Sequence, residues 1–367
     1  MKIINIEAIP VPIPFTHGGP MTDFVVGKAW TELGHLLVRV DTDADITGYG
    51  DAFGFNAIHT TKTAIDTLIT PIALGRDATE IGPLMDELAV KTHIFGRYGV
   101  TTFALSGLDI ALWDIAGKAA GLPLYKMLGG AYRNEIPTYA SLLKYGDPDI
   151  CARLTEEAIG SGYRSIKLHE STVAPVAATR AAGGDKLPIM LDVNCSWTPH
   201  QASKMAEALA PYDLHWLEEP LWPPENFEAL AQLRAESGIP IASGENACTV
   251  WQFEQMINNG AVDYAQPSIT KVGGLSEMCK ISTLAETANV RIQPHSPYFG
   301  PGFLATLHFI AASRDIDLIE RFYVKLETDM YDNTLDPVDG LIRVPDGPGL
   351  GMDPNPTFIE KYRMDKS

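Results

Sequence analysis

Residues 188–194 read Pro-Ile-Met-Leu-Asp-Val-Asn, residues 214–220 read Leu-His-Trp-Leu-Glu-Glu-Pro, and residues 239–246 read Ile-Pro-Ile-Ala-Ser-Gly-Glu-Asn. Each segment is a short apolar run followed by a carboxylate, which is Asp192, Glu218 and Glu245 in turn. The carboxylates are 26 and 27 residues apart, which suits one strand, one helix and their connections. This spacing predicts consecutive βα units of a parallel barrel, with an acid at the carboxyl end of each strand.

The same rhythm extends in both directions from this stretch. Eight short apolar runs follow Gly130, and helical or polar segments of roughly 15–20 residues separate them. The runs are Ile136–Ala140, Ser165–Leu168, Pro188–Leu191, Leu214–Leu217, Ile239–Ala242, Val262–Ala265, Val290–Gln293 and Asp317–Ile319. Eight runs suit an α/β fold of the TIM-barrel type. Because the segment between the second and third runs is short for a crossover, we expect a small helix there.

The first 130 residues have a different pattern. Lys2–Pro10 and His35–Val40 have the composition of strands, and Ile46–Gly50 begins a return strand. Ala104–Lys118 has apolar residues at helical spacing, and Gly121 follows it. The sequence therefore predicts three parts: an α+β unit over residues 1–130, a barrel over residues 131–325, and a C-terminal segment over residues 326–367 that packs back on the first unit.

The three strand-end acids indicate a metal site. Strand ends of a barrel converge on one mouth, where three carboxylates repel each other unless a cation joins them. A ligand set made only of oxygens favours Mg²⁺, with Mn²⁺ as the second choice. One strand-end acid would be an ordinary structural feature. Three in consecutive units, with Asn194 and Asn246 beside them, favour a metal site made by Asp192, Glu218 and Glu245.

Candidate acid–base groups follow other runs. Lys167 and His169 are two residues apart at the end of the second run, so they share one strand face. Beside a metal they suggest a cation that stabilises substrate charge and a base that accepts a proton, and the alternative is a structural ion pair. His295 follows the seventh run as a candidate acid or base from the opposite side. Glu320 ends the eighth run, where it either hydrogen-bonds an enolate oxygen or pairs with a neighbouring cation.

Composition excludes several function classes. The formal net charge of −18 among 367 residues disfavours nucleic acid and anionic membranes as partners. The chain begins without a signal peptide pattern, and no run approaches the roughly 18 apolar residues of a membrane span, so we expect a cytoplasmic protein. The four cysteines are scattered, without the spacing of a zinc site or a disulfide framework.

Taken in order along the chain, these motifs resemble the enolase superfamily, and within it the branch that is similar to mandelate racemase and muconate lactonizing enzyme. The resemblance covers nearly the whole chain. Beyond the residues above, the motifs that carry it are Gly48-Tyr49-Gly50-Asp51-Ala52, Leu128-Gly129-Gly130, Gln266-Pro267-Ser268-Ile269-Thr270-Lys271-Val272-Gly273-Gly274 and Pro345-Asp346-Gly347-Pro348-Gly349-Leu350-Gly351.

The resemblance implies a modified (β/α)₇β barrel with an N-terminal α+β cap that the C-terminal tail completes. It also implies that Phe15–Gly27 and Phe53–Thr61 close over the substrate and select it. In this superfamily a Lys or His base takes a proton α to a carboxylate while Mg²⁺ stabilises the ene-diolate. Lys167 and Glu320 would help to neutralise that charge.

The sequence departs from the racemase pattern at two positions. The second lysine of the strand-two motif is replaced by His169, and the aspartate that partners the strand-seven histidine is replaced by Ser268. His295 therefore lacks its usual orienting partner, which makes a two-base racemase less favoured. Lys271 resembles the base of lactonising relatives, but it lies three residues beyond Ser268 and is expected to point away from the metal.

We therefore expect a Mg²⁺-dependent lyase that dehydrates a sugar acid, an aldonate or aldarate, to a 2-keto-3-deoxy acid. His169 would abstract the proton and His295 would protonate the leaving hydroxyl. The alternatives are a racemase, epimerase or lactone cycloisomerase on a hydroxy acid, and a non-catalytic metal-stabilised barrel. We expect a small carboxylate substrate and a homo-oligomer. The substrate-binding candidates are Asn194, Ser268, His17 and Asn56; further loop candidates are Thr16, Phe24, Phe53 and His59.

Overall fold

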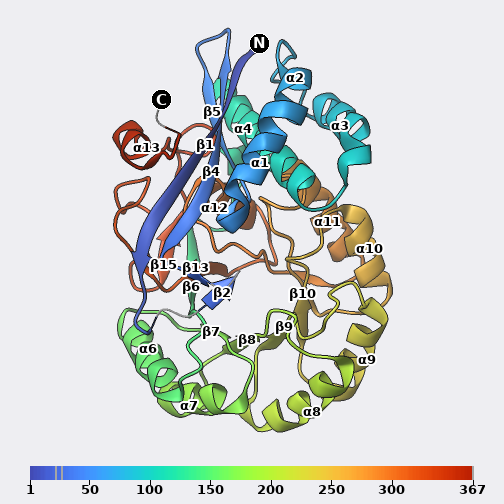
Figure 1. Ribbon diagram of the computed structural model, residues 1–367, viewed down its shortest axis with the longest axis vertical. Coiled ribbons are helices and arrows are strands. Elements are labelled where there is room, and N and C mark those ends of the chain that lie inside the picture. The colour runs from blue at the N-terminus through green and yellow to red at the C-terminus, as the bar shows by residue number, and fades with distance from the viewer. Residues whose placement is uncertain (21–22, 26–27, 366–367) are drawn as a thin grey trace.

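The computed structural model describes residues 1–20, 23–25 and 28–365. It has an antiparallel sheet with helices at one end and a curved parallel sheet ringed by helices at the other (Figure 1). The strands of the first sheet lie in the order β14-β1-β4-β5, and β2 and β3 form a separate pair. The bounds are β1 Ile3–Thr16, β2 Asp23–Val25, β3 Lys28–Ala29, β4 Glu32–Thr42, β5 Thr47–Ala52 and β14 Lys325–Leu326.

The helices of this N-terminal part pack against the sheet because close contact is possible at its glycines. At Gly50 on β5, an added Cβ would lie 1.9 Å from the Gly107 carbonyl oxygen of the central helix α4. Apolar residues of both elements fill one core. The helices are η1 Phe55–Ala57, α1 Ile58–Ala64, η2 Ile65–Ile69, α2 Thr70–Ala73, α3 Ile81–Thr92, η3 His93–Phe95, α4 Val100–Ala120 and α5 Leu124–Met127.

Helix α4 is long and apolar enough to cross a membrane by length and composition alone. Asp109 and Asp114 interrupt its apolar residues, so the sequence contains no uninterrupted apolar run of that length there. In the structure, 78% of its most apolar window is buried inside the protein, and it carries the buried carboxylates of Asp109 and Asp114. The helix is therefore the core helix of the N-terminal part.

The parallel sheet has the strand order β12-β11-β10-β9-β8-β7-β6-β13, and every predicted apolar run forms one of these strands. Within the described residues, no backbone ladder joins β12 to β13; instead the Gln293 side chain donates a hydrogen bond to the Leu318 carbonyl at 2.9 Å. The strands are β6 Glu135–Ser141, β7 Ile166–His169, β8 Ile189–Asp192, β9 Trp216–Glu218, β10 Ile241–Ser243, β11 Tyr264–Ala265, β12 Arg291–Ile292 and β13 Ile319–Phe322.

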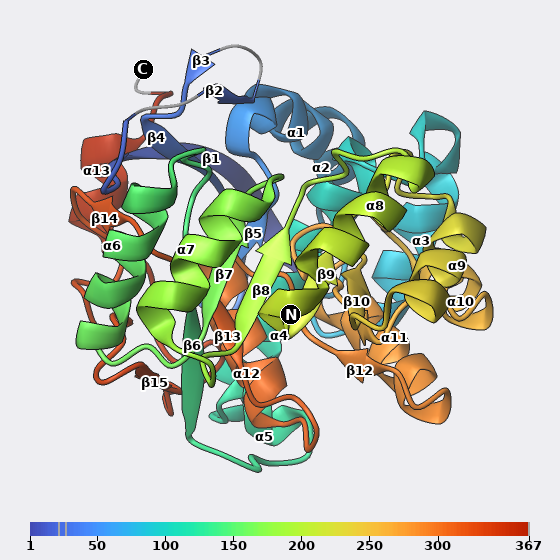
Figure 2. The same cartoon turned by 90° about the horizontal axis from the view of Figure 1, so that it is seen from below.

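Helices cover the outside of this sheet, as Figure 2 shows for α6 to α9 beside β6 to β10. Helix α7 spans 11 residues, the same length as α8 and α9, so the expectation of a small helix after the second run was wrong. Short connections on both sides leave room for it. The helices are α6 Pro148–Gly160, α7 Val173–Gly183, α8 Pro199–Leu209, η4 Ala210–Tyr212, α9 Phe227–Ser237, α10 Val250–Asn258, α11 Leu275–Thr287 and α12 Pro301–Ala311.

The C-terminal segment contacts both the barrel and the N-terminal part. It contains β15 Leu341–Arg343, which pairs antiparallel with β6, and α13 Pro356–Tyr362, which lies beside β1. The backbone N–H of Leu350 donates to the Asp114 carboxylate at 2.8 Å, and the backbone N–H of Met364 donates to the Pro10 carbonyl at 3.0 Å. Both ends of the chain therefore build the cap.

Candidate active site

The three predicted metal ligands lie together at the carboxyl ends of adjacent strands. Strand pairing sets Asp192 of β8 beside Glu218 of β9, and Glu245 follows β10. Each offers a carboxylate oxygen, and these oxygens lie within 4.8 Å of one another. Asp192 and Glu218 are fully buried. A compact, oxygen-only donor set in a buried position fits a hard divalent cation.

Lys167 joins this cluster to Glu320. Its Nζ lies 2.9 Å from Glu218, 3.4 Å from Asp192 and 2.7 Å from Glu320, and all four side chains are fully buried. Burial alone would lower the pKa of Lys167, but the carboxylates of Glu218 and Glu320 raise it well above its ordinary value. The lysine is therefore held as a cation. Of the two alternatives for Glu320, the structure shows pairing with a neighbouring cation.

His169 extends from the same strand as Lys167 and lies against the cluster. Its Nδ1 is 2.6 Å from the Leu142 carbonyl oxygen, and its Nε2 is 3.4 Å from an Asp192 oxygen. A carbonyl can only accept, so Nδ1 must carry the proton in this contact. In the neutral ring Nε2 is then the basic nitrogen, and it faces the carboxylates.

His295 lies against Glu245, on the side of the cluster away from His169. Its Nε2 is 2.8 Å from a Glu245 oxygen, and its Nδ1 is 3.2 Å from the Ser268 hydroxyl. Ser268 also hydrogen-bonds the hydroxyl of Tyr298. Sequence reasoning found no orienting partner for His295, whereas the structure gives it one in Ser268.

A second acid, Glu219, directly follows β9, and both of its carboxylate oxygens have protein partners. Glu219 accepts hydrogen bonds from the Ser243 hydroxyl at 2.7 Å, the Gly244 backbone N–H at 2.9 Å and the Asn246 side chain at 3.1 Å. It is buried and thereby ties the end of β9 to the segment that carries Glu245. Partners of this kind orient metal ligands. The sequence motif contained Glu219, but nothing in it distinguished the two acids.

The direction of the Lys271 side chain differs from the prediction. The side chain was predicted to point away from the metal, but its Nζ lies 3.9 Å from a Glu245 oxygen and 4.9 Å from the centre of the Phe53 ring. Residues 269–273 form a turn directly after Ser268, and this turn places the lysine at the mouth. Burial would raise the pKa of Glu245, but His295 and Lys271 lower it.

The four predicted substrate-binding residues have different positions. Ser268 is part of the site, and Asn194 lies exposed at the end of β8, where its backbone N–H bonds Asp192 at 2.9 Å. His17 instead packs near Tyr145, 5.4 Å between ring centres, and lines a cavity of about 750 Å³ beside α6. Asn56 is exposed in η1, and among the described contacts none joins it to the carboxylates. The side chain of Phe24 lies outside the described residues.

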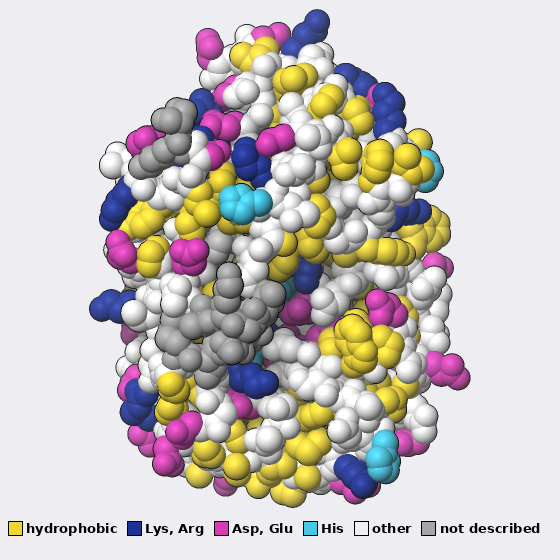
Figure 3. Space-filling view, in the orientation of Figure 1, with side chains coloured by type: hydrophobic (Ala, Val, Ile, Leu, Met, Phe, Trp, Pro, Cys, Tyr) yellow, Lys and Arg dark blue, Asp and Glu magenta, His cyan; other side chains and the backbone are white. Residues whose placement is uncertain are grey.

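Aromatic side chains that the sequence analysis largely missed form an arch between the two histidines. Consecutive ring centres from His169 to His295 are 5.6–6.5 Å apart. We call this set the aromatic arch, and its members are Phe322, Trp30, Phe55 and Tyr298. Two of them come from the cap and two from the barrel, so long-range folding creates the arch. Figure 3 shows a hollow between the two parts, with acidic and basic side chains inside it.

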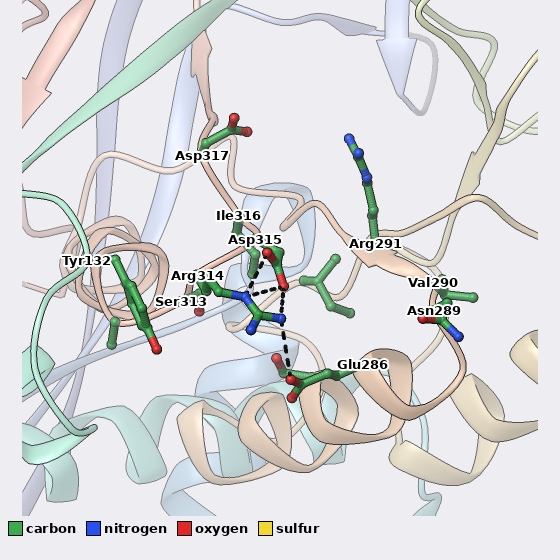
Figure 4. Close-up of a pocket in the computed structure, with 13 residues that line it drawn as sticks. Tyr132, Glu286, Asn289, Val290, Arg291, Ser313, Arg314, Asp315, Ile316 and Asp317 are labelled. Atoms are coloured by element: carbon green, nitrogen blue, oxygen red, sulfur yellow. Dashed lines mark hydrogen bonds and ion pairs between the residues drawn. The ribbon is translucent and has the colours of Figure 1, made fainter.

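A separate cavity of about 640 Å³ lies at the opposite end of the strands, where β12 and β13 begin. In Figure 4, Arg314 lies between Asp315 and Glu286, with ion pairs of 2.8 and 3.9 Å. The amino-terminal end of a barrel generally serves stability, whereas the carboxyl-terminal mouth carries the chemistry. The carboxylate cluster is therefore the candidate active site.

A capped α/β barrel with acids at three consecutive strand ends defines a class of barrel enzymes, and comparison with known proteins identifies the family. Residues 151–358 match the family described as enolase C-terminal domain-like. Residues 27–129 match the N-terminal domain of mandelate racemase / muconate lactonizing enzyme. The chain belongs to the enolase superfamily, in the mandelate racemase-like group.

The chain is similar along nearly its whole length to enzymes with different activities. It is 32% identical to a 3,6-anhydro-alpha-L-galactonate cycloisomerase of Streptomyces coelicolor, covering 95% of this chain and 94% of the relative. It is 30% identical to an arabinonate dehydratase of Saccharolobus solfataricus, covering 89% and 90%. A crystal structure of a racemase from Streptomyces coelicolor with bound magnesium is 28% identical, covers 99% and 100%, and has a TM-score of 0.86.

Proposed function

We propose that this chain is a Mg²⁺-dependent lyase that dehydrates a sugar acid to a 2-keto-3-deoxy acid. One observation carries the proposal: two histidines flank a single carboxylate cluster, with His169 against Asp192 and His295 against Glu245. A substrate carboxylate held at the cluster would present its α-carbon to one histidine and its β-oxygen to the other. Among the relatives, several are named as dehydratases of sugar acids.

The side chains of the site would divide the reaction between them. Asp192, Glu218 and Glu245 would hold Mg²⁺, which would supply positive charge next to the substrate carboxylate. Lys167, held as a cation by its buried partners, adds charge at the same end. Nε2 of His169 accepts the α-proton, because Nδ1 is occupied by the Leu142 carbonyl.

The elimination is completed on the side of the site where His295 lies. The C–H electron pair first moves into the substrate carboxylate to give an enolate, and it then forms the new carbon–carbon double bond as the bond to the β-oxygen breaks. A proton from His295 joins the leaving hydroxyl, which departs as water. The remaining enol becomes the 2-keto-3-deoxy acid by moving its hydroxyl proton to carbon. Ser268 orients His295 through Nδ1, so that Nε2 is directed into the site.

A racemase, epimerase or cycloisomerase is the second candidate, and Lys271 is the observation that favours it. Its Nζ lies near Glu245 on the same side as His295, which gives that face two proton carriers. The relative named as a cycloisomerase adds support. A non-catalytic barrel is the remaining alternative.

The test is incubation with Mg²⁺ in D₂O against pooled sugar acids, α-hydroxy acids and their lactones, with product masses as the readout. Loss of one water that EDTA abolishes supports dehydration. Deuterium gain without loss of water supports an isomerase instead: exchange at the α-carbon of an intact hydroxy acid supports epimerisation or racemisation, and conversion of a lactone to a ring-opened keto acid supports cycloisomerisation. If Glu245→Gln keeps full turnover, the proposed metal site is wrong.

A further inference from the structure

The aromatic arch connects the two histidines through consecutive ring contacts. Phe322 lies with its ring centre 6.1 Å from that of His169, and Tyr298 lies 6.0 Å from that of His295. Trp30 and Phe55 complete the connection from the cap side, 5.6 Å apart. A substrate held between the histidines would therefore lie beside these aromatic rings.

Three polar side chains next to the arch, those of Tyr298, Lys271 and Arg321, already have partners. The Tyr298 hydroxyl bonds Ser268, and Lys271 lies by Glu245 and over Phe53. Arg321, the neighbour of Phe322, stacks on the Phe299 ring at 4.0 Å and bonds Asp336 at 3.0 Å. Lys271 and Arg321, two cations beside the arch, are thus both paired.

Ring faces select by charge and by hydration. An aromatic face carries partial negative charge, so it attracts C–H groups and repels a carboxylate. A hydroxyl that leaves water for such a surface loses hydrogen bonds that the rings do not replace. A C–H-rich group instead gains by leaving water. The arch therefore favours a substrate end with few oxygens.

We propose that the aromatic arch selects sugar acids whose end remote from the reacting carboxylate is poor in hydroxyls and carries no second carboxylate. In chemical terms, the substrate is a deoxy aldonate rather than an aldarate. This rests on the proposed function, because it assumes that the reacting carboxylate lies at the Mg²⁺ ligands. It narrows the aldonate-or-aldarate expectation to one class.

Binding tests the proposal without requiring turnover. Calorimetry with Mg²⁺-loaded protein compares 2-hydroxyhexanoate with 2-hydroxyadipate, which differ only in a terminal methyl against a terminal carboxylate. We expect the hexanoate to bind about 10–100-fold more tightly, the range that one apolar contact usually gives. Equal affinity, or tighter binding of the adipate, overturns the proposal.

A variant then assigns the preference to the arch. Phe55 has a φ of 37°, a conformation that Asn tolerates, so Phe55→Asn removes the ring with little backbone cost. We expect the methyl preference to shrink by about 10-fold in Phe55→Asn and to persist in Tyr132→Asn, where an exposed ring is lost at the far end of the barrel. An unchanged preference in Phe55→Asn contradicts the assignment.

Turnover separates this proposal from the proposed function. If deoxy aldonates lose water faster than their hydroxylated and dicarboxylate counterparts, both stand. If aldarates lose water fastest, the arch proposal fails and the dehydratase proposal stands. If no acid exchanges its α-proton in D₂O while the binding preference holds, the dehydratase proposal fails and the arch proposal stands.

Discussion

The carboxylate of Glu245 is the residue on which most of the site depends. It is the one predicted ligand that both His295 and Lys271 contact. Glu245→Gln keeps the shape of the side chain but removes its charge. We expect Mg²⁺ affinity to fall by more than about 100-fold, because changes even to partners of ligands cost 10–100-fold.

Calorimetric Mg²⁺ titration measures this loss directly. Glu207→Gln, which removes an exposed acid from α8, is the matched control and should bind like the unchanged protein. Normal Mg²⁺ binding by Glu245→Gln would show that the cation binds elsewhere.

Ser268 is expected to affect only the dehydration step, because it acts through His295. Ser268→Ala removes the group that holds Nδ1, so we expect kcat for dehydration to fall about 10–100-fold, part of what a general acid contributes. KM and the α-proton exchange catalysed by His169 should change little. Quenched-flow product analysis and deuterium incorporation separate the two steps. Tyr298→Phe, which removes only the second contact, should be milder; equal loss of exchange and dehydration would mean a general structural defect.

Single residues were predicted best where a strand run ended in them. Asp192, Glu218, Lys167 and His169 follow apolar runs, and strand geometry alone brings such positions together. The aromatic arch could not be predicted in this way. Trp30 and Phe322 lie almost 300 positions apart in the chain, and no local pattern indicates that their rings meet. Lys271 was misplaced because a tight turn, rather than a strand, sets its direction.

At the scale of elements, the first turn of α11 connects the cap to the candidate site. Asp109 of α4 accepts hydrogen bonds from the backbone N–H of Ser276 at 3.0 Å and from its hydroxyl at 2.5 Å. The Trp113 ring N–H also donates to Ser276, at 2.9 Å. A carboxylate at a helix N-terminus binds N–H groups that have no partner within the helix. The cap thus anchors the turn that follows Ser268 and Lys271.

Because Asp109 is buried, its contribution to the stability of the fold depends on pH. Burial raises its pKa from the ordinary 3.8 to about 7, although Ser276 opposes the rise. Because the folded state holds this proton more tightly than the unfolded state, the contribution of Asp109 to stability decreases as pH rises from about 4 to about 7. The loss is on the order of 4 kcal/mol. Asp109→Asn should lack it, so urea unfolding at pH 4.5 and 7.5 should differ less in the variant. Parallel pH dependence in both proteins would contradict this.

The absence of a side chain at Gly274 allows Asp109 to reach Ser276. The φ of Gly274 is +86°, and an added Cβ would lie 2.3 Å from an Asp109 oxygen. We expect Gly274→Ala to lower the free energy of unfolding by about 2–4 kcal/mol, from backbone strain and lost contact together. Gly75→Ala is the control, because Gly75 has a φ of +76° but nothing within 4 Å of an added Cβ. Denaturant titration should show a smaller loss there; equal losses would mean that strain alone matters.

Element positions followed from periodicity, with two misses. All eight predicted runs became parallel strands because buried strands in a barrel are short and continuously apolar. The length of α7 was underestimated because connection lengths carry no periodic signal. The tight turn after Ser268 was also invisible, since it depends on contacts with α4 that the local sequence does not contain.

For the whole molecule, exposed apolar side chains predict self-association. Val90, Ile94, Phe95 and Tyr98, at the end of α3 and just beyond it, are 54–71% exposed. Exposed apolar groups gathered in one region mark interaction surfaces. We expect a homo-oligomer in sedimentation experiments and dissociation in Ile94→Ser combined with Phe95→Ser. Val338→Ser, which changes an isolated residue 73% exposed, is the control. A monomeric unchanged protein would contradict the prediction.

Both chain ends contribute to the cap, and this orders events during synthesis. Phe15 of β1 pairs with Leu326 of β14, and Pro10 pairs with Met364. At the usual 5–20 residues per second, a ribosome needs on the order of tens of seconds between the first and last of these partners. Throughout that interval an apolar strand edge of the nascent chain is open to other proteins. The cap sheet is therefore completed only after the barrel between β1 and β14 has been synthesised.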